Sequence, residues 1–144
     1  MSFDASDLER FVAAQSPVFD DVCAELAAGS KRSHWMWFIF PQLRSLGRSS
    51  TARYYGIADL AEAEAYWQHP LLSQRLTKCT GLVLSVRGRT VSQIFGSPDD
   101  LKLRSCMTLF ERVAPGEAAF GEVLARYYDG QRDEMTLAAL RHAT

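Results

Sequence analysis

The stretch "PLLSQRLTKCTGLVLSV", residues 70–86, decides the fold class. Its apolar side chains recur three or four positions apart, at Leu72, Leu76, Cys79, Val83 and Val86. This is the spacing of one face of an α-helix that packs against a core. Pro70 suits the first helical position, where the missing N–H of proline costs no hydrogen bond. A helix with one apolar face needs partners, so we expect the flanking sequence to supply further elements.

Similar helical patterns precede and follow this stretch. Apolar residues at helical spacing, bounded by polar caps and helix-stopping Gly or Pro, predict further helices. They cover residues 6–15, 16–29, 59–69, 90–96, 97–114, 115–130 and 133–142. We expect Ser16, Asp59 and Ser97 to be N-caps. No β-hairpin signal interrupts the series. We therefore predict an all-α fold, one compact multi-helix domain over residues 1–144 with about seven short helices.

The composition is that of a soluble globular domain. Of the 144 residues, 47% are hydrophobic and 23% are charged, which is sufficient for a core without disulfides or metal. No run approaches the ~20 apolar residues of a membrane span. The acidic N-terminal stretch "MSFDASDLERF" is unlike a signal peptide. We therefore expect a cytoplasmic protein without a membrane partner.

The cysteines suggest neither a disulfide framework nor a metal site. Cys23, Cys79 and Cys106 are odd in number and far apart, and the three histidines are equally scattered. Neither set has the local spacing of zinc ligands. We expect three buried free thiols in a reducing compartment, and no metal or cofactor.

Positive charge is concentrated in two acid-free blocks, although the formal net charge is −1. Residues 26–58 contain five cations and residues 65–98 contain four, with no Asp or Glu in either block. Such blocks predict a local positive field. The near-neutral chain as a whole argues against a nucleic-acid partner, because a polyanion would be repelled about as much as attracted.

The most aromatic stretch is "KRSHWMWFIFPQ", residues 31–42. It is too short for periodicity to distinguish a strand from a buried turn of helix, so we expect an irregular or short extended segment near 34–47. Filling the core is one role for its aromatic rings. A wall on which a planar ligand stacks is the other, with Trp35 or Trp37 as the ring and Gln42 reading a ligand edge.

Basic and hydroxyl side chains flank these aromatics and predict an anion site. The candidate contacts are Lys31, Arg32, Arg48, Ser49, Thr51 and Arg53. Gly47 would let the backbone approach a ligand closely. The plainer interpretation of "GRSSTARYYG" is a capped helix start with solvated arginines. His34 is a candidate general base, because neighbouring cations favour a neutral imidazole.

Lys102 is a further candidate ligand contact. It lies three residues before Ser105 on the predicted helix 97–114, so the two share a face. A Ser–Lys pair can act as nucleophile and base, but no third group or oxyanion hole accompanies it. An ion pair between Lys102 and Asp99 explains the lysine more simply.

Three blocks of the sequence resemble one known family. They are "KRSHWMWFIFPQLRSLGRSSTARYYGI", "HPLL" with the following "RL", and "IFGSPDDLKLRSCMTLF". They resemble the bacterial family catalogued as domain of unknown function 1810, over residues 11 to 140. The resemblance implies an all-α domain and no particular reaction. Family members are sometimes labelled calpastatin, but calpastatin-type inhibitors are disordered and this composition forms a core. Cys106 stands where the family usually has Ser, which argues against a nucleophilic hydroxyl there.

These observations lead to three functional hypotheses. The first is a small-molecule-binding domain, with or without catalysis, for a phosphorylated or nucleotide-like ligand. The second is a protein–protein interaction module that uses the same basic and aromatic patch. The third is an RNA-binding module based on aromatic stacking. A ligand site should be concave, whereas an interface should be larger and flatter.

Overall fold

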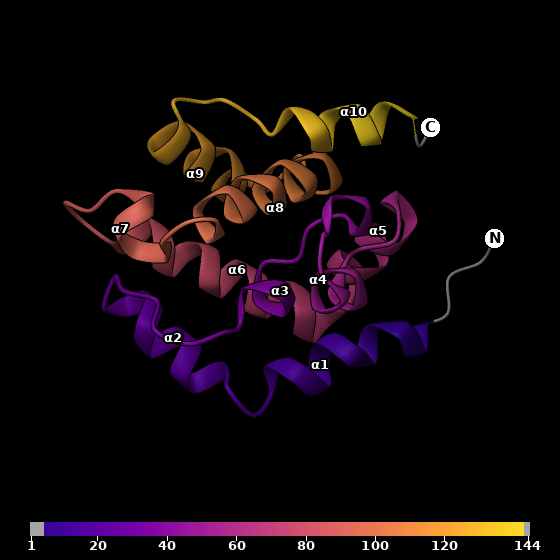
Figure 1. Ribbon diagram of the computed structural model, residues 1–144, viewed down its shortest axis with the longest axis horizontal. Helices are drawn as coiled ribbons and strands as arrows, with labels where there is room; N and C mark the ends of the chain where they lie inside the picture. The colour runs from indigo at the N-terminus through magenta and orange to yellow at the C-terminus, as the bar shows by residue number, and fades with distance from the viewer. Residues whose placement is uncertain (1–4, 143–144) are drawn as a thin grey trace.

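The computed structural model describes residues 5–142, and these form short helices joined by brief connections (Figure 1). The all-α fold is confirmed: within this range there is no strand, only an isolated parallel bridge between Leu43 and Ile57. The described residues form ten α-helices rather than about seven. They are α1 (Glu9–Gln15), α2 (Phe19–Ala27), α3 (Met36–Ile39), α4 (Ser50–Tyr55), α5 (Leu60–Gln68), α6 (Pro70–Ser85), α7 (Val91–Phe95), α8 (Asp99–Val113), α9 (Ala118–Tyr128) and α10 (Glu134–His142).

Helix α6 occupies the centre of the domain, as its apolar face predicts. It packs against α1, α2, α3, α5 and α9. Leu72, Leu76, Cys79 and Val83 are almost fully buried on this face. Pro70 takes the first turn, and the N-cap His69 accepts a hydrogen bond from the backbone N–H of Leu72. Helix α8 is the second central element and packs against α5, α7, α9 and α10.

Two of the three predicted helix caps are incorrect. Asp59 does cap α5, because its carboxylate accepts the backbone N–H of Glu62 at 2.9 Å. Ser16 instead ends α1, and α2 begins at Phe19 after Val18. Ser97 is also displaced, since Pro98 is the N-cap of α8. The capping rule places the Ser directly before the first helical residue. In both Ser-Pro pairs the Ser lies further from the helix, and its side chain does not cap it.

The segment near 34–47 is irregular, and its aromatic run contains the single helical turn α3. After α3 the chain is extended, and Arg44–Leu46 form the short 3-10 helix η2. The N–H of Ile57 donates to the carbonyl of Gln42, and that of Arg44 donates to the carbonyl of Ile57. These two bonds fix the connection that leads into α4.

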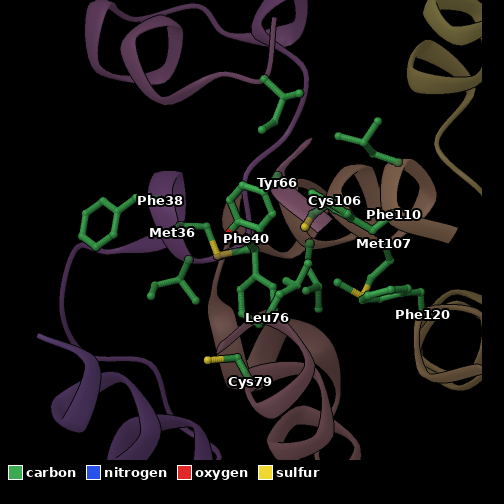
Figure 2. Packing of buried hydrophobic residues seen from close by; sticks show 14 of the residues in the cluster. Met36, Phe38, Phe40, Tyr66, Leu76, Cys79, Cys106, Met107, Phe110 and Phe120 are labelled. Atoms are coloured by element: carbon green, nitrogen blue, oxygen red, sulfur yellow. The ribbon is translucent and has the colours of Figure 1, made fainter. Parts of the chain in front are cut away.

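The core is rich in aromatic and sulfur-containing side chains. Figure 2 shows part of it, where side chains from residues 36–40, α5, α6, α8 and α9 gather. Tyr66 lies at its centre, with ring centroids 5.1 Å from Phe11 and 5.2 Å from Phe110. The amide of Gln15 donates to the Tyr66 hydroxyl and to the carbonyl of Phe38, so this buried polar pair is satisfied. Among residues 5–142, no helix has both the length and the hydropathy needed to cross a bilayer.

Candidate functional site

A cleft of about 600 Å³ opens between the η2–α4 region and α8, and is closed at one side by the start of α10. We call it the cleft throughout. Its polar lining residues are Gln42, Arg48, Ser49, Lys102, Arg104, Ser105 and Asp133. Its apolar lining residues are Leu46, Ala52, Pro98, Leu101 and Met135. The cleft therefore combines three cations with a single carboxylate and an apolar wall.

The two sides of the cleft follow from local helix geometry. Helix α8 buries Leu103, Cys106 and Met107 completely, which turns Leu101, Lys102, Arg104 and Ser105 toward the cleft side. On the facing side, the Ser49 hydroxyl caps α4 by accepting the N–H of Ala52 at 3.1 Å. The cap places Ser49 and the preceding Arg48 at the mouth of the cleft.

The cations of the cleft are only partly neutralised. The Lys102 ammonium is 3.6 Å from Asp99, and Asp99 also pairs with Lys31 at 3.0 Å. The single Asp99 carboxylate therefore pairs with both lysines and neutralises them only in part. Arg48 is exposed and has no ion pair or hydrogen bond with any described residue. Arg48, from the first acid-free block, therefore lines the same cleft as Lys102 and Arg104 of α8.

Arg104 is the cation of the cleft that has a buried donor without a partner among the described residues. Its Nη2 is 3.9 Å from Asp133, a long ion pair, and its Nε is buried without a hydrogen-bond partner in the described part of the chain. Asp133 is itself engaged, because its carboxylate accepts the backbone N–H and the hydroxyl of Thr136. An unpaired buried donor is costly. A rotation of the Arg104 guanidinium onto an anion in the cleft would therefore gain hydrogen bonds.

Lys102 connects the cleft to two adjoining spaces. A side pocket of about 270 Å³ is lined by Lys31, His34, Trp37, Asp99 and Lys102, among others. A narrow gap between the side pocket and the cleft also has Trp37, Gln42 and Lys102 in its lining. The Lys102 ammonium lies 5.4 Å from the centroid of the Trp37 ring, within cation–π range. Trp37 is the only partly exposed ring of the run 35–40.

Trp35 does not belong to this site. Its side chain is 1% exposed and packs in the core beside Phe40 and Phe95. Its indole N–H donates to the carboxylate of Glu25 at 3.0 Å. The sequence offered either Trp as the stacking ring, and the structure places Trp37 at the site and Trp35 in the core.

The other predicted residues divide between the site and the surface. Arg53 lines a hollow that shares Leu46, Arg48 and Met135 with the cleft. His34 is exposed at the side pocket. Arg32 and Thr51 are exposed and line neither the cleft nor the spaces that adjoin it. The structure thus brings together most of the predicted basic residues but not Arg32.

Sequence reasoning did not include the contribution of α10. Asp133 and Met135 reach the cleft because α10 packs against α8, and no local pattern signals that contact. Met135 is 60% exposed and Leu101 is 51% exposed, so the apolar wall extends to the surface. No three His, Cys, Asp or Glu side chains gather as metal ligands in the described part of the chain.

Comparison with known proteins identifies the family. A family model described as "Protein of unknown function (DUF1810)" matches residues 5–140. The chain belongs to this family. The DUF1810 fold of the chain is similar to a crystal structure of the conserved hypothetical protein Rv1873 from Mycobacterium tuberculosis, with 56% identity and a TM-score of 0.94. That match covers 96% of this chain and 99% of the other. No curated protein matches this DUF1810 chain.

Proposed function

We propose that the protein is a small-molecule-binding domain whose cleft receives a phosphorylated or nucleotide-like ligand. One observation carries the proposal. Arg48, from the connection before α4, lines one concave cleft together with Lys102 and Arg104 of α8, and the single carboxylate in that lining is already engaged. Converging cations repel one another unless an anion neutralises them. The volume of about 600 Å³ is within the usual range for small-ligand sites.

The polar side of the cleft suits a phosphate group. The guanidinium groups of Arg48 and Arg104 offer forked donors, and Lys102 offers a point charge. The Ser105 hydroxyl lies at the same wall but donates to the carbonyl of Leu101 at 3.2 Å, so its single proton is engaged and the three cations supply the donors for a phosphate. Charge-assisted contacts of this kind contribute about 1.5–3 kcal/mol each.

The apolar side suits a planar or hydrocarbon group. Leu46, Leu101 and Met135 form an apolar wall, and Trp37 supplies an aromatic face in the adjoining side pocket. Met adapts its shape to a bound group, and an indole stacks on planar rings. A ligand with a charged end at Arg48 and Arg104 and a planar end near Trp37 would use both.

We further propose that His34 is the residue on which any proton transfer at this site depends. It lines the side pocket with Lys31, Asp99 and Lys102, so a ligand that extends past Lys102 would meet its imidazole. Catalysis is not required by the binding proposal. The three free cysteines are consistent with our proposal that the protein works in the cytoplasm, where thiols stay reduced.

A thermal-unfolding screen tests the proposal. The purified chain is heated with nucleotides, sugar phosphates and nucleotide sugars, one at a time, at fixed ionic strength. A ligand that binds only the native state stabilises that state by about 2.7 kcal/mol when its free concentration is about 100 times the Kd. A true ligand therefore raises the Tm measurably. A screen in which no phosphorylated compound raises the Tm, while unphosphorylated analogues do, would overturn the phosphate half of the proposal.

Variants then locate the site. For the compound with the largest Tm shift, Lys102→Gln and Arg48→Gln should each raise the Kd by about tenfold or more. Arg112→Gln is the matched control, because Arg112 is exposed on α8 outside the cleft and should leave the Kd unchanged. Unchanged binding in Lys102→Gln would move the site elsewhere. Binding of single-stranded RNA that falls steeply with salt would favour the RNA-binding alternative.

A further inference from the structure

The connection between α6 and α7 lies near α9 (Figure 1). Residues of this connection and of α9 line a second basic hollow. We call it the loop hollow. Its volume is about 500 Å³, and it shares no lining residue with the cleft. Three arginines line it, Arg87, Arg89 and Arg126. No carboxylate belongs to its lining as the structure describes it. The loop hollow gathers Arg87 and Arg89 from the second acid-free block of the sequence, and no cation of that block lines the cleft.

Two of these arginines are held in place without being neutralised. The Arg126 guanidinium donates to the carbonyl of Leu84, and the Nη2 of Arg89 donates to the carbonyl of Gln93 at 3.0 Å. A guanidinium has five N–H donors, so each keeps donors for another partner. None of the three arginines forms an ion pair within the described range. By contrast, Arg10 and Arg132 each pair with a glutamate.

The loop between the arginines adds backbone donors. Gly88 has φ +72°, in the left-handed region that glycine enters without strain, and this turn lets Arg87 and Arg89 line the same hollow. The backbone N–H groups of Arg87, Gly88 and Arg89 donate to no described acceptor. Successive unpaired N–H groups beside guanidinium groups are the donor set that recurs in phosphate sites.

We propose that the loop hollow binds the phosphate group of a small soluble phosphate ester, at a site separate from the cleft. The forked donors of Arg87, Arg89 and Arg126 match tetrahedral phosphate oxygens, and the anion relieves the repulsion among three converging cations. Val86 and Val91, which also line the hollow and are partly buried, provide an apolar surface for the carbon part of the ester. This inference does not depend on the function proposed for the cleft.

Residue-resolved NMR on the ¹⁵N-labelled chain tests this proposal, with inorganic pyrophosphate as the probe and sodium chloride at equal ionic strength as the reference. We expect saturable shifts of the amides of Arg87, Gly88 and Arg89 with pyrophosphate and not with chloride. Arg87→Gln should raise the Kd read from these amides by about tenfold or more. Arg87 has no hydrogen bond or ion pair with a described residue, so this change should leave the fold intact.

Two matched variants separate this site from other causes. Arg112→Gln removes a positive charge outside the loop hollow and should leave the pyrophosphate titration unchanged. An equal loss of affinity in Arg112→Gln would show that the effect depends only on the net charge of the protein. Lys102→Gln alters the cleft, and a loss at the loop amides in that variant would show that the two sites are not separate. Non-saturating shifts with pyrophosphate overturn the proposal. So does binding to phosphatidic-acid vesicles without binding to pyrophosphate, because the phosphate would then come from a lipid.

Discussion

Arg10 and Glu62 form a two-bond ion pair that joins α1 to α5 across the domain. The distances are 3.0 Å from Nη2 to Oε1 and 3.2 Å from Nη1 to Oε2. The side chains are 10% and 1% exposed. The Arg10 guanidinium also donates to the carbonyls of Tyr54 and Gly56, and the Glu62 carboxylate accepts the N–H of Ala58. The pair therefore fixes the turn between α4 and α5, and with it one side of the cleft.

Breaking this pair should be strongly destabilising. Arg10→Ala leaves the Glu62 carboxylate buried without its cation, and we expect a loss of about 3–5 kcal/mol in the free energy of unfolding. Urea denaturation at neutral pH measures it. Arg112→Ala is the control, with an expected change of about 0.5 kcal/mol or less, because Arg112 is exposed and without an ion pair among the described residues. Equal losses in both variants would contradict the prediction.

The stability contributed by Glu25 should depend on pH. Burial opposes its ionisation, but hydrogen bonds from Ser33, from the backbone N–H of Arg32 and from the Trp35 indole outweigh burial and lower its pKa from 4.5 to about 2. A lowered carboxyl pKa stabilises the folded state above the ordinary pKa, and this stabilisation is lost as the pH falls toward 2. The difference in unfolding free energy between the native chain and Glu25→Gln should therefore be larger at pH 6 than at pH 3. A difference that does not vary with pH would refute this role.

The two neighbouring tryptophans should respond differently to truncation. Trp35→Ala empties a core position and should cost about 3–5 kcal/mol of stability. Trp37→Ala removes a partly exposed ring and should cost about 1 kcal/mol, while it weakens binding of the cleft ligand. A denaturation curve and a binding titration on each variant check both expectations. Similar stability losses in the two variants would place Trp37 in the core as well.

The three thiols should react at different rates in the folded protein. Burial raises the pKa of Cys79 to about 12, with the neighbouring Cys23 as a further cause, and burial also raises the pKa of Cys106. Cys23 is partly exposed, which corrects the expectation that all three thiols are buried. Mass spectrometry after brief alkylation at pH 8 should show one labelled thiol, Cys23, and three only after denaturation. Equal labelling of all three in the native protein would contradict the prediction.

The sequence alone determined the class of fold and the strongest helices. The period of Leu72, Leu76, Cys79 and Val83 depends only on local spacing, and the same spacing identified α8, because a long helix repeats its signal over several turns. The cap of α5 at Asp59 was also predictable, since the acceptor and the N–H it serves are three residues apart. The first residues of α2 and α8, which follow the two Ser-Pro pairs, were not predictable, because they depend on how the preceding chain enters the helix.

The tertiary structure alone decided which of the candidate residues share a site. Trp35 and Trp37 are indistinguishable by type and spacing, and only the packing of α3 buries one and leaves the other beside Lys102. Arg48, Arg104 and Met135 meet because η2, α8 and α10 pack around one cleft, although they are distant in sequence. A local pattern states what each segment prefers. Which segments meet depends on the burial of many apolar faces at once, which no single stretch encodes.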